Sequence, residues 1–299
     1  SPIKIASGVK EIDTSALKFL ERVPGFISDS LPGNYGNKIL DEFFMIQKKR
    51  YPTVSDKLLF IGERGLGAVV FRPAIENSED AVEALELHDL FQKAKKLERK
   101  DKEYFGIKSA FVVSAHSFVG GARSKMVCAI NLDTKLVYLG DRTKPLADGL
   151  IHAIVKYDNA NNDESKSTCS KIEYIYHLLA VESGIEMAPC YLLEDGEKQH
   201  FVTKRFDIEN DGTRYHVHSL AGMLELDYNI ARQIGYEDLL RTAVEIGATT
   251  SLNQLMLQML FNYLFVNQDD HMRNFSFMCG EDFRYRATPA YDITYANGK

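Results

Sequence analysis

The chain has 299 residues, a mass of 33.8 kDa and a formal net charge of -6, and 45% of its residues are hydrophobic and 26% charged. This composition is typical of a globular protein, and the length allows one large domain or two or three small ones. A sequence pI near 5.8 argues against a protein whose main task is to wrap nucleic acid or to coat an anionic membrane.

The four cysteines lie far apart, without a C-x-x-C pair and without histidines clustered beside them. This spacing supports neither a disulfide framework nor a structural zinc site, so we expect a reducing, cytoplasmic setting. No signal peptide opens the chain, and its most apolar stretch, residues 252–266, is too often interrupted to cross a bilayer. We expect that stretch to be a buried core helix. Its polar interruptions are Asn253, Gln254, Gln258 and Asn262.

The first hundred residues mix helix and turn signals. A turn-rich segment around Pro32 precedes apolar residues at helical spacing between Ile39 and Ile46, which predict a helix. Residues 57–74 predict a strand, a tight glycine turn and a second strand, and we interpret the glycine cluster there as a structural hairpin. Residues 79–104 predict one or two charged amphipathic helices whose polar end is a solvated face or a linker.

The pattern then changes to short β-type runs. These runs are residues 109–115, 125–132, 135–140 and 150–157. A helix is predicted over residues 170–184, ending at Gly184. Its predicted apolar face consists of Ile172, Ile175, Leu178 and Leu179. A hairpin follows around Asp195 and Gly196, and the rest of the chain is mostly helical. This order predicts a small β-rich lobe and then a larger helical lobe.

A polar cluster at residues 265–277 stands between two segments that both have buried character, a costly position unless its groups are paired or hold a metal. Asp269 and Asn274 have the five-residue step of the kinase catalytic loop, where the Asp accepts the substrate hydroxyl proton and the Asn helps to hold a metal. Asp292 follows 18 residues beyond Asn274, at the end of a predicted strand pair. A second carboxylate there is what magnesium bound to phosphates needs.

Two further features are compatible with phosphate binding. The glycine pair at 120–121 allows close approach of the backbone to a ligand, and Arg123 and Lys125 add positive charge, although a plain turn between strands has the same pattern. Lys156 ends a predicted strand, and Glu173 lies on the next predicted helix. Protein kinases hold nucleotide phosphates with such a pair, but lysines at strand ends are common.

Two other functions stay open on these residues alone. A metal hydrolase would use Asp269, Asp270 and His271, but it needs more histidine ligands, and the remaining seven histidines are dispersed without i, i+4 pairing on any predicted helix. A binding module would use the polar cluster as a buried structural network, and it predicts no nucleotide-dependent stabilisation.

Five segments in order, VGGARSKM, IVKY, KRFD, NQDDHMRNFSF and PAYDIT, resemble the HipA family of bacterial toxin serine/threonine kinases. Residues 24–44, 61–71, 217–227 and 236–240 are also similar to that family, so the resemblance covers nearly the whole chain. It implies an α+β, two-lobed protein-kinase-like fold preceded by part of a HipA-type N-terminal subdomain. The expected domains are a partial N-terminal region (1–105), a β-rich nucleotide-binding lobe (106–205) and a helical catalytic lobe (206–299).

By position, the resemblance implies that ATP and Mg²⁺ are the cofactors of a serine/threonine protein kinase. Asp269 would be the catalytic base, and Asn274 and Asp292 would hold the magnesium. Lys204, Arg205 and Phe206 would form the adenine edge. The full set implied to contact ATP is Gly120, Gly121, Ala122, Arg123, Ser124, Lys125, Lys156, Lys204, Arg205, Phe206, His271, Arg273, Asn274, Tyr291 and Asp292.

The chain departs from the family pattern in its glycine loop. Relatives commonly have Gln where this chain has Arg123. The serine that relatives autophosphorylate directly precedes the loop Val, whereas here Phe118 occupies that place and Ser117 lies one residue earlier. We expect autophosphorylation at Ser117, with Ser114 and Ser124 as alternatives.

Family members usually have more residues at both ends, so we expect this chain to be a fragment of a longer protein. The resemblance further implies a helix-turn-helix antitoxin partner and an aminoacyl-tRNA synthetase as the protein substrate. From the acidic composition and the lack of a membrane-spanning apolar run we expect no direct nucleic-acid binding and no membrane association. Substrate identity depends on surface shape, which a likeness at the level of the fold does not fix.

Overall fold

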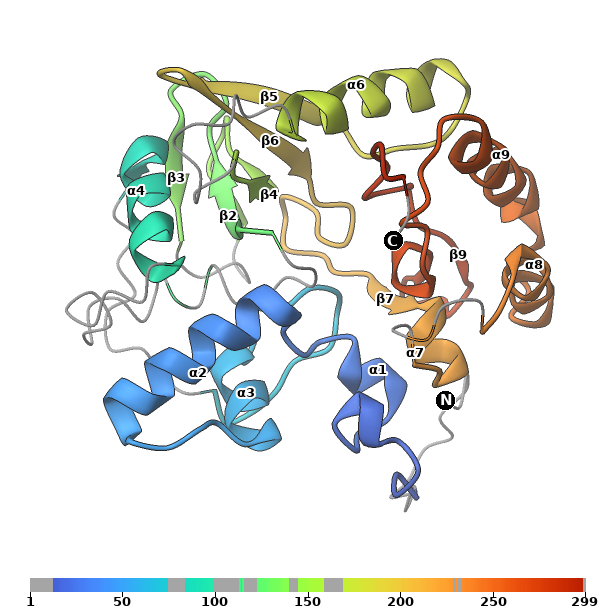
Figure 1. The fold of residues 1–299 in the computed structure, drawn as a ribbon, viewed down its shortest axis with the longest axis horizontal. Coiled ribbons are helices and arrows are strands. Elements are labelled where there is room, and N and C mark those ends of the chain that lie inside the picture. The colour runs from blue at the N-terminus through green and yellow to red at the C-terminus, as the bar shows by residue number, and fades with distance from the viewer. Residues whose placement is uncertain are drawn as a thin grey trace. The chain divides into compact units, whose positions relative to one another are not determined.

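The structure is a computed structural model that describes residues 13–74, 84–98, 113, 115, 123–139, 145–158, 169–227, 230 and 233–297. Its chain divides into two compact units (Figure 1). The six-stranded unit comprises Leu31–Tyr174 and Pro189–Arg214, and the three-stranded unit comprises Ser1–Ser30, Ile175–Ala188 and Tyr215–Lys299. The mixed α and β content with antiparallel sheets agrees with the predicted α+β class. The predicted domain boundaries stay a prediction.

An antiparallel sheet with the strand order β1-β3-β2-β4-β6-β5 is the centre of the six-stranded unit. Its strands are β1 (Leu85–Glu86), β2 (Lys125–Ile130), β3 (Leu136–Tyr138), β4 (Ile151–Lys156), β5 (Cys190–Asp195) and β6 (Lys198–Lys204). The predicted runs at 125–132, 135–140 and 150–157 each supply a strand, whereas the run at 109–115 lies almost wholly outside the described residues. Every residue of β2 is buried, including Lys125 at its start.

The predicted hairpin around Asp195 and Gly196 is confirmed. Strands β5 and β6 pair up to the turn, where Asp195 lies opposite Lys198. Gly196 has a φ of 59°, a left-handed conformation that glycine adopts without the steric cost of a side chain.

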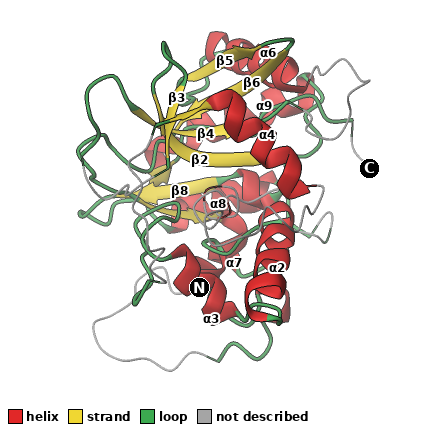
Figure 2. Ribbon diagram, turned by 90° about the vertical axis from the view of Figure 1, so that its left-hand side faces the viewer, coloured by secondary structure: helices red, strands yellow, loops and turns green. Residues whose placement is uncertain are grey.

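Among the helices whose bounds the structure describes, α2 (Asn34–Lys48), α3 (Val54–Ile61) and α4 (Leu87–Glu98) belong entirely to the six-stranded unit. Figure 2 shows α4 crossing one face of the sheet. Leu90 and Phe91 of α4 join the apolar core, together with Phe44 of α2 and Phe60 of α3. The rings of Phe44 and Phe60 lie 6.0 Å apart, edge to face. The helices predicted within residues 29–50 and 79–104 are therefore present.

The sequence prediction of two strands within residues 57–74 is wrong. Residues 54–61 form α3, and residues 62–74 contain no strand. Thr53 starts the helix with a capping box: its side chain accepts from the Asp56 N–H, and the Asp56 carboxylate accepts from the Thr53 N–H. This start signal outweighs the strand propensity of the apolar run that follows.

The three-stranded unit contains a small antiparallel sheet with the order β7-β8-β9. Its strands are β7 (His216–Ser219), β8 (Ser276–Cys279) and β9 (Arg286–Ala287). Its helices are η1 (Lys18–Leu20), α1 (Gly25–Ser28), α7 (Leu220–Leu224), α8 (Tyr236–Glu245), η3 (Thr249–Ser251), α9 (Leu252–Leu264) and η4 (Met272–Asn274). One apolar core joins α7, α8 and α9 through Met223, Leu239 and Leu255, and it reaches Phe277 of β8. The helix predicted within residues 252–266 is therefore confirmed, but it is not buried throughout, because Leu260 and Leu264 are 49% and 69% exposed.

Helix α6 (Cys169–Glu182) runs from one unit into the other, and its predicted apolar face is wrong. Ile175 and Leu178 are 52% and 50% exposed, whereas Glu173 is buried. The cause is an ion pair between Glu173 and Lys156 of β4, which turns a polar side of the helix inward. The buried face of α6 is therefore set by a tertiary contact, which the helical periodicity of the sequence does not indicate.

The structure describes the state of the cysteines and the length and apolar character of the helices. All four cysteines are described, and all are free in the structure. Among the described residues, the helices lack the combination of length and apolar character that a membrane span requires.

The capping box of α3 gives a stability prediction. Thr53→Ala removes the side chain that accepts from Asp56, so we expect the free energy of unfolding to fall by about 1 kcal/mol. The matched control is Ser55→Ala, an exposed change inside the same helix that leaves the cap intact. Urea denaturation compares the two variants, and equal stability would show that the cap does not hold α3.

Candidate functional site

The polar cluster of residues 265–277, here called the polar loop, connects α9 to β8 within the three-stranded unit. It leaves the helix through Val266, whose φ of 57° is unusual for a β-branched residue. The Asn267 N–H donates to the Asn262 carbonyl at 2.9 Å, and the Asn267 side chain donates to the Asn262 side chain at 3.0 Å. The last polar residue of α9 thus fixes the start of the loop.

A hydrogen bond inside the polar loop sets its shape. The Nδ2 group of buried Asn274 donates to the backbone oxygen of Asp269 at 2.7 Å. The Asn274 N–H also donates to the His271 carbonyl at 2.8 Å, and half-buried His271 is the residue that precedes η4. Asp269 itself is exposed. The two residues predicted from the kinase spacing are therefore directly connected.

The segment that carries Asp292 runs beside the polar loop. Asn267 and Ala296 form a parallel bridge, with the Ala296 N–H donating to Val266 at 3.0 Å and the Gln268 N–H donating to Ala296 at 2.8 Å. Asp292 has a φ of 53°, in the left-handed region that Asp tolerates better than most residues. The backbone therefore brings the predicted metal-binding carboxylate to the same unit as Asp269 and Asn274.

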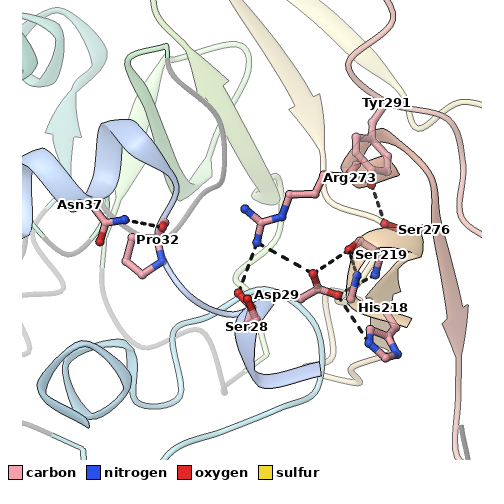
Figure 3. Close-up of polar contacts among 10 residues, drawn as sticks. Ser28, Asp29, Pro32, Asn37, His218, Ser219, Arg273, Ser276 and Tyr291 are labelled. Carbon is pink, nitrogen blue, oxygen red and sulfur yellow. Dashed lines mark hydrogen bonds and ion pairs between the residues drawn. The ribbon is translucent and has the colours of Figure 1, made fainter. Parts of the chain in front are cut away.

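Tyr291 ties this segment to the polar loop a second time (Figure 3). Its hydroxyl donates to the Arg273 carbonyl at 2.7 Å and lies 2.6 Å from the Ser276 hydroxyl, which can donate in return. Burial raises the Tyr291 pKa, so the hydroxyl stays protonated as a donor at neutral pH. The carbonyl oxygen of Ser28 accepts from the Arg273 guanidinium at 3.3 Å.

Asp270 has a structural contact that disfavours the metal-hydrolase hypothesis. Its carboxylate accepts a short hydrogen bond from the Tyr236 hydroxyl, which in turn accepts from the Asn262 side chain at 3.0 Å. Burial and the Asp270 contact both raise the Tyr236 pKa. Among the described residues, no three His, Cys, Asp or Glu side chains gather as a metal site would require.

The six-stranded unit contains a second group of predicted residues. Lys156 at the end of β4 forms a close ion pair with Glu173 of α6, and Arg123 lies 3.8 Å from the same carboxylate. Lys125 of β2 is buried and lies opposite Lys156 in the strand register. The lysine–glutamate pair suggested by the sequence pattern is therefore present.

Arg205 has partners of its own within the six-stranded unit. Its buried guanidinium forms two hydrogen bonds with Asp207, at 2.6 and 2.9 Å, and donates to the Gly65 carbonyl at 3.2 Å. Asp207 also accepts from the Gly67 N–H at 2.5 Å. These contacts hold the backbone of the glycine cluster at residues 62–67 through Gly65 and Gly67. The residues on either side of Arg205, Lys204 and Phe206, are half-buried.

The glycine loop is only partly visible in the described chain. Gly120, Gly121 and Ala122 lie outside the described residues, as do the candidate phosphorylation sites Ser114 and Ser117. Ser124, the third candidate, is buried, and its hydroxyl forms a 2.9 Å hydrogen bond with the Tyr35 hydroxyl. That contact makes Ser124 a poor acceptor of phosphate.

The predicted site residues therefore fall into two groups, one in each unit. The three-stranded unit brings together Asp269, His271, Arg273, Asn274, Tyr291 and Asp292. The six-stranded unit contains Arg123, Ser124, Lys125, Lys156, Lys204, Arg205 and Phe206. Sequence reasoning missed Asp29, whose carboxylate reaches Ser219 and Arg273, and it missed the Tyr236–Asp270 contact. No pattern in the neighbouring sequence indicates the Asp29 contacts or the Tyr236–Asp270 contact.

Comparison with known proteins adds independent information. A family model described as the HipA-like C-terminal domain matches residues 117–298. The structure is similar to HipA in a Shewanella oneidensis MR-1 toxin–antitoxin complex with HipB and operator DNA, with a TM-score of 0.61 and 17% identity over 91% of this chain and 63% of that chain. No curated protein sequence matches.

A second solved structure, the Helicobacter pylori proinflammatory kinase CtkA, has a TM-score of 0.38 and 15% identity over 58% of this chain and 54% of that chain. Such a score is too low to support an argument about the fold. The likeness to the Shewanella protein concerns the fold, and this chain spans less than two thirds of that protein's length.

The contact of Tyr236 with Asp270 gives a second stability prediction. Tyr236→Phe removes the hydroxyl between Asp270 and Asn262, so we expect the free energy of unfolding to fall by roughly 1–3 kcal/mol. The control is Tyr263→Phe, which removes a hydroxyl from a residue that is 83% exposed. If chemical denaturation finds both variants equally stable, Asp270 is not held by Tyr236, and the hydrolase hypothesis regains a ligand.

Proposed function

The chain belongs to the HipA family, and from that membership and the two residue groups we propose that it is an ATP- and Mg²⁺-dependent serine/threonine protein kinase. It would transfer the γ-phosphate of ATP to a protein hydroxyl. The proposed fold is that of a two-lobed protein kinase, with the nucleotide-binding residues on the six-stranded unit and the catalytic residues on the three-stranded unit.

The observation that carries the proposal is the pairing of the Asp292 segment with the polar loop through Asn267 and Ala296. Because of this pairing, the exposed carboxylate of Asp269 and two residues with possible oxygen ligands for a metal, Asn274 and Asp292, lie on neighbouring backbone segments. A kinase needs these same three groups: a base beside the acceptor hydroxyl and oxygen ligands for the metal. A passive structural network has no reason to leave the Asp269 carboxylate exposed while it buries Asn267 and Asn274 of the same loop.

The residues present fit a magnesium ion. The Asn274 Nδ2 group is turned to the Asp269 carbonyl, so the amide oxygen is the atom left to bind a cation. Together with the Asp292 carboxylate it would give the hard, all-oxygen set of ligands that Mg²⁺ prefers, and ATP phosphates and water would complete it. Bound magnesium would offset the negative charge of the phosphates during transfer.

Asp269 would accept the proton of the substrate hydroxyl as that hydroxyl attacks phosphorus. Its backbone is fixed by Asn274, and its exposure leaves the carboxylate accessible to a protein substrate. On the six-stranded unit, Lys156 would bind phosphate oxygens, and the Glu173 contact would hold the lysine side chain in place. Most of the catalytic effect would come from positioning and from charge.

The biological setting is also part of the proposal. An antitoxin partner is proposed for this chain because the similar Shewanella HipA is seen in a complex with HipB and operator DNA. An aminoacyl-tRNA synthetase is the protein substrate implied by the family resemblance, and Ser117 is the proposed site of autophosphorylation. The match covers only 63% of the Shewanella protein, so partner, substrate and autophosphorylation are proposals for this chain.

Removing the base tests the proposed reaction. Asp269→Asn keeps the size and the backbone of the residue, so we expect native-like unfolding and at least about a 100-fold loss of phosphate transfer from radiolabelled ATP in the full-length protein. The control is Glu281→Gln, which neutralises an exposed carboxylate in the turn after β8. Undiminished transfer by Asp269→Asn would rule out the assigned base.

Nucleotide binding is tested separately by thermal unfolding. Saturation with Mg-ATP at about 100 times its Kd should stabilise the wild type by about 2.7 kcal/mol, which corresponds to a rise in Tm of roughly 5 °C. Asp292→Ala should lose most of that shift, and Asp282→Ala, an exposed carboxylate outside the polar loop, should retain it. Equal shifts in all three proteins, or a shift without magnesium, would count against the metal site.

A further inference from the structure

Asp29 follows α1 at the end of the first segment of the three-stranded unit. Only 14% of its side chain is exposed. The base, metal and ATP assignments do not use it, yet its contacts lead directly to the polar loop (Figure 3). A mostly buried carboxylate is unfavourable unless it has donors, so its partners indicate what it does.

The carboxylate holds the junction of β7 and α7. One oxygen accepts from the Ser219 N–H and the other from the Ser219 hydroxyl, both at 2.7 Å. The same hydroxyl accepts from the Gly222 N–H at 3.0 Å and so caps α7. Ser219 lies opposite Ser276 in the strand register, and the Leu220 N–H donates to the Phe275 carbonyl at 2.8 Å. Asp29 therefore supports the backbone that pairs with the end of the polar loop.

The carboxylate also faces the polar loop itself. Its Oδ1 atom lies 4.0 Å from the Arg273 guanidinium, and the adjacent Ser28 carbonyl accepts from the same group at 3.3 Å. Two consecutive residues thus hold one face of Arg273. Because Arg273 precedes Asn274, its orientation is coupled to the residue that fixes Asp269.

Close backbone packing leaves Asp29 little freedom. A Cβ atom on Gly222 would lie 2.4 Å from an Asp29 oxygen, and one on Gly25 would lie 1.9 Å from the Gly222 carbonyl. Both distances are shorter than real contacts, so the two glycines are needed for α1 to reach α7. The Gly25 N–H further donates to the Glu225 carboxylate at 3.1 Å. The position of Asp29 is therefore built into the packing of these helices.

The charges around Asp29 identify Arg273 as its ionic partner. Burial lowers the His218 pKa to about 3, so this imidazole, 3.8 Å away, is neutral at pH 7. Burial raises the Asp29 pKa to about 6, while the Ser219 hydrogen bonds and the Arg273 charge act in the opposite direction. The carboxylate is therefore mostly ionised at about pH 8, with Arg273 as the cation beside it.

We propose that Asp29 is a positioning residue that holds Arg273, and through it the polar loop, in the geometry that phosphate transfer requires. Asp29 is not among the residues assigned to ATP or to the acceptor hydroxyl, and its ion pair with that set is with Arg273, so its effect would be indirect. The proposal rests on the kinase assignment of Asp269 and Asn274 for its functional meaning. Its structural part, the coupling of Asp29 to the loop, stands independently of that assignment.

Asp29→Asn separates charge from anchoring. An amide can still accept from the Ser219 N–H and can donate to the Ser219 hydroxyl, but it loses the negative charge beside Arg273. Hydrogen–deuterium exchange at about pH 8 then measures the loop directly. We expect the amides of residues 269–276 to exchange roughly tenfold faster than in the wild type, a change of about 1.4 kcal/mol in opening free energy.

The double variant identifies the route of the effect. If Asp29 acts through Arg273, Asp29→Asn adds no further exchange in the Arg273→Gln background. The matched control is Asp13→Asn, which neutralises an exposed carboxylate of the same N-terminal segment and should leave the loop unchanged. Unchanged exchange in Asp29→Asn, or additive increases in the double variant, would overturn the proposal.

A second variant and an activity measurement complete the test. If Asp29→Asn does not fold, Arg273→Gln alone must speed exchange in the loop while α8 keeps its wild-type rates, and uniform exchange would reject the coupling. In an active protein, kcat/KM for ATP should fall about tenfold in Asp29→Asn and should keep its wild-type value in Asp13→Asn. A wild type that transfers no phosphate would refute the kinase assignment, and exchange would still report on Asp29.

Discussion

The hydrogen bond from the Asn274 side chain to the Asp269 carbonyl is the constraint on which the candidate site depends. It closes the polar loop on itself, so the exposed Asp269 is attached to a backbone that buried groups hold in place. Tyr291 holds the Arg273 carbonyl on the same loop, and the pairing of Asn267 with Ala296 holds the segment around Asp292 beside it. A side chain that must meet a substrate can be exposed because its backbone is held in this way.

The polar residues of α9 contribute to this arrangement from outside the loop. Asn262 accepts from Asn267 and donates to Tyr236, whose hydroxyl reaches Asp270. Gln254 forms two hydrogen bonds with the Glu186 backbone, at 2.9 and 3.0 Å. Two of the four polar interruptions, Gln254 and Asn262, thus have specific structural partners. Through Asn262 and Tyr236 the helix supports Asp270 of the polar loop.

The sequence predicts the parts of this structure that local patterns determine. Strand periodicity locates β2 and β4, and the Asp195-Gly196 pair locates a hairpin. The prediction fails where a tertiary contact decides, because the ion pair with Lys156 reverses the expected face of α6. It also fails for α3, where we interpret the apolar run as a strand. The Thr53 capping box is a local signal for a helix start that this interpretation overlooks.

The candidate site shows the same division. Spacing alone connects Asp269 to Asn274, and the structure joins them by a hydrogen bond. Spacing does not indicate that Asp270 binds Tyr236, a residue 34 positions earlier. It gives no sign of Asp29, whose hydrogen-bonding partner Ser219 lies 190 residues away. Residues that support a site from distant segments become visible only when the chain is folded.

The central claim is that the polar loop and the Asp292 segment form a metal–nucleotide site for phosphate transfer. A crystal structure of the full-length protein with Mn²⁺ and a non-hydrolysable ATP analogue tests it most directly, because manganese gives an anomalous signal and replaces magnesium at oxygen sites. The account predicts an anomalous peak bound by the Asn274 amide oxygen and the Asp292 carboxylate, with the γ-phosphate near Asp269. A peak bound instead by Asp269, Asp270 and His271, or nucleotide bound away from Asp292, would contradict it.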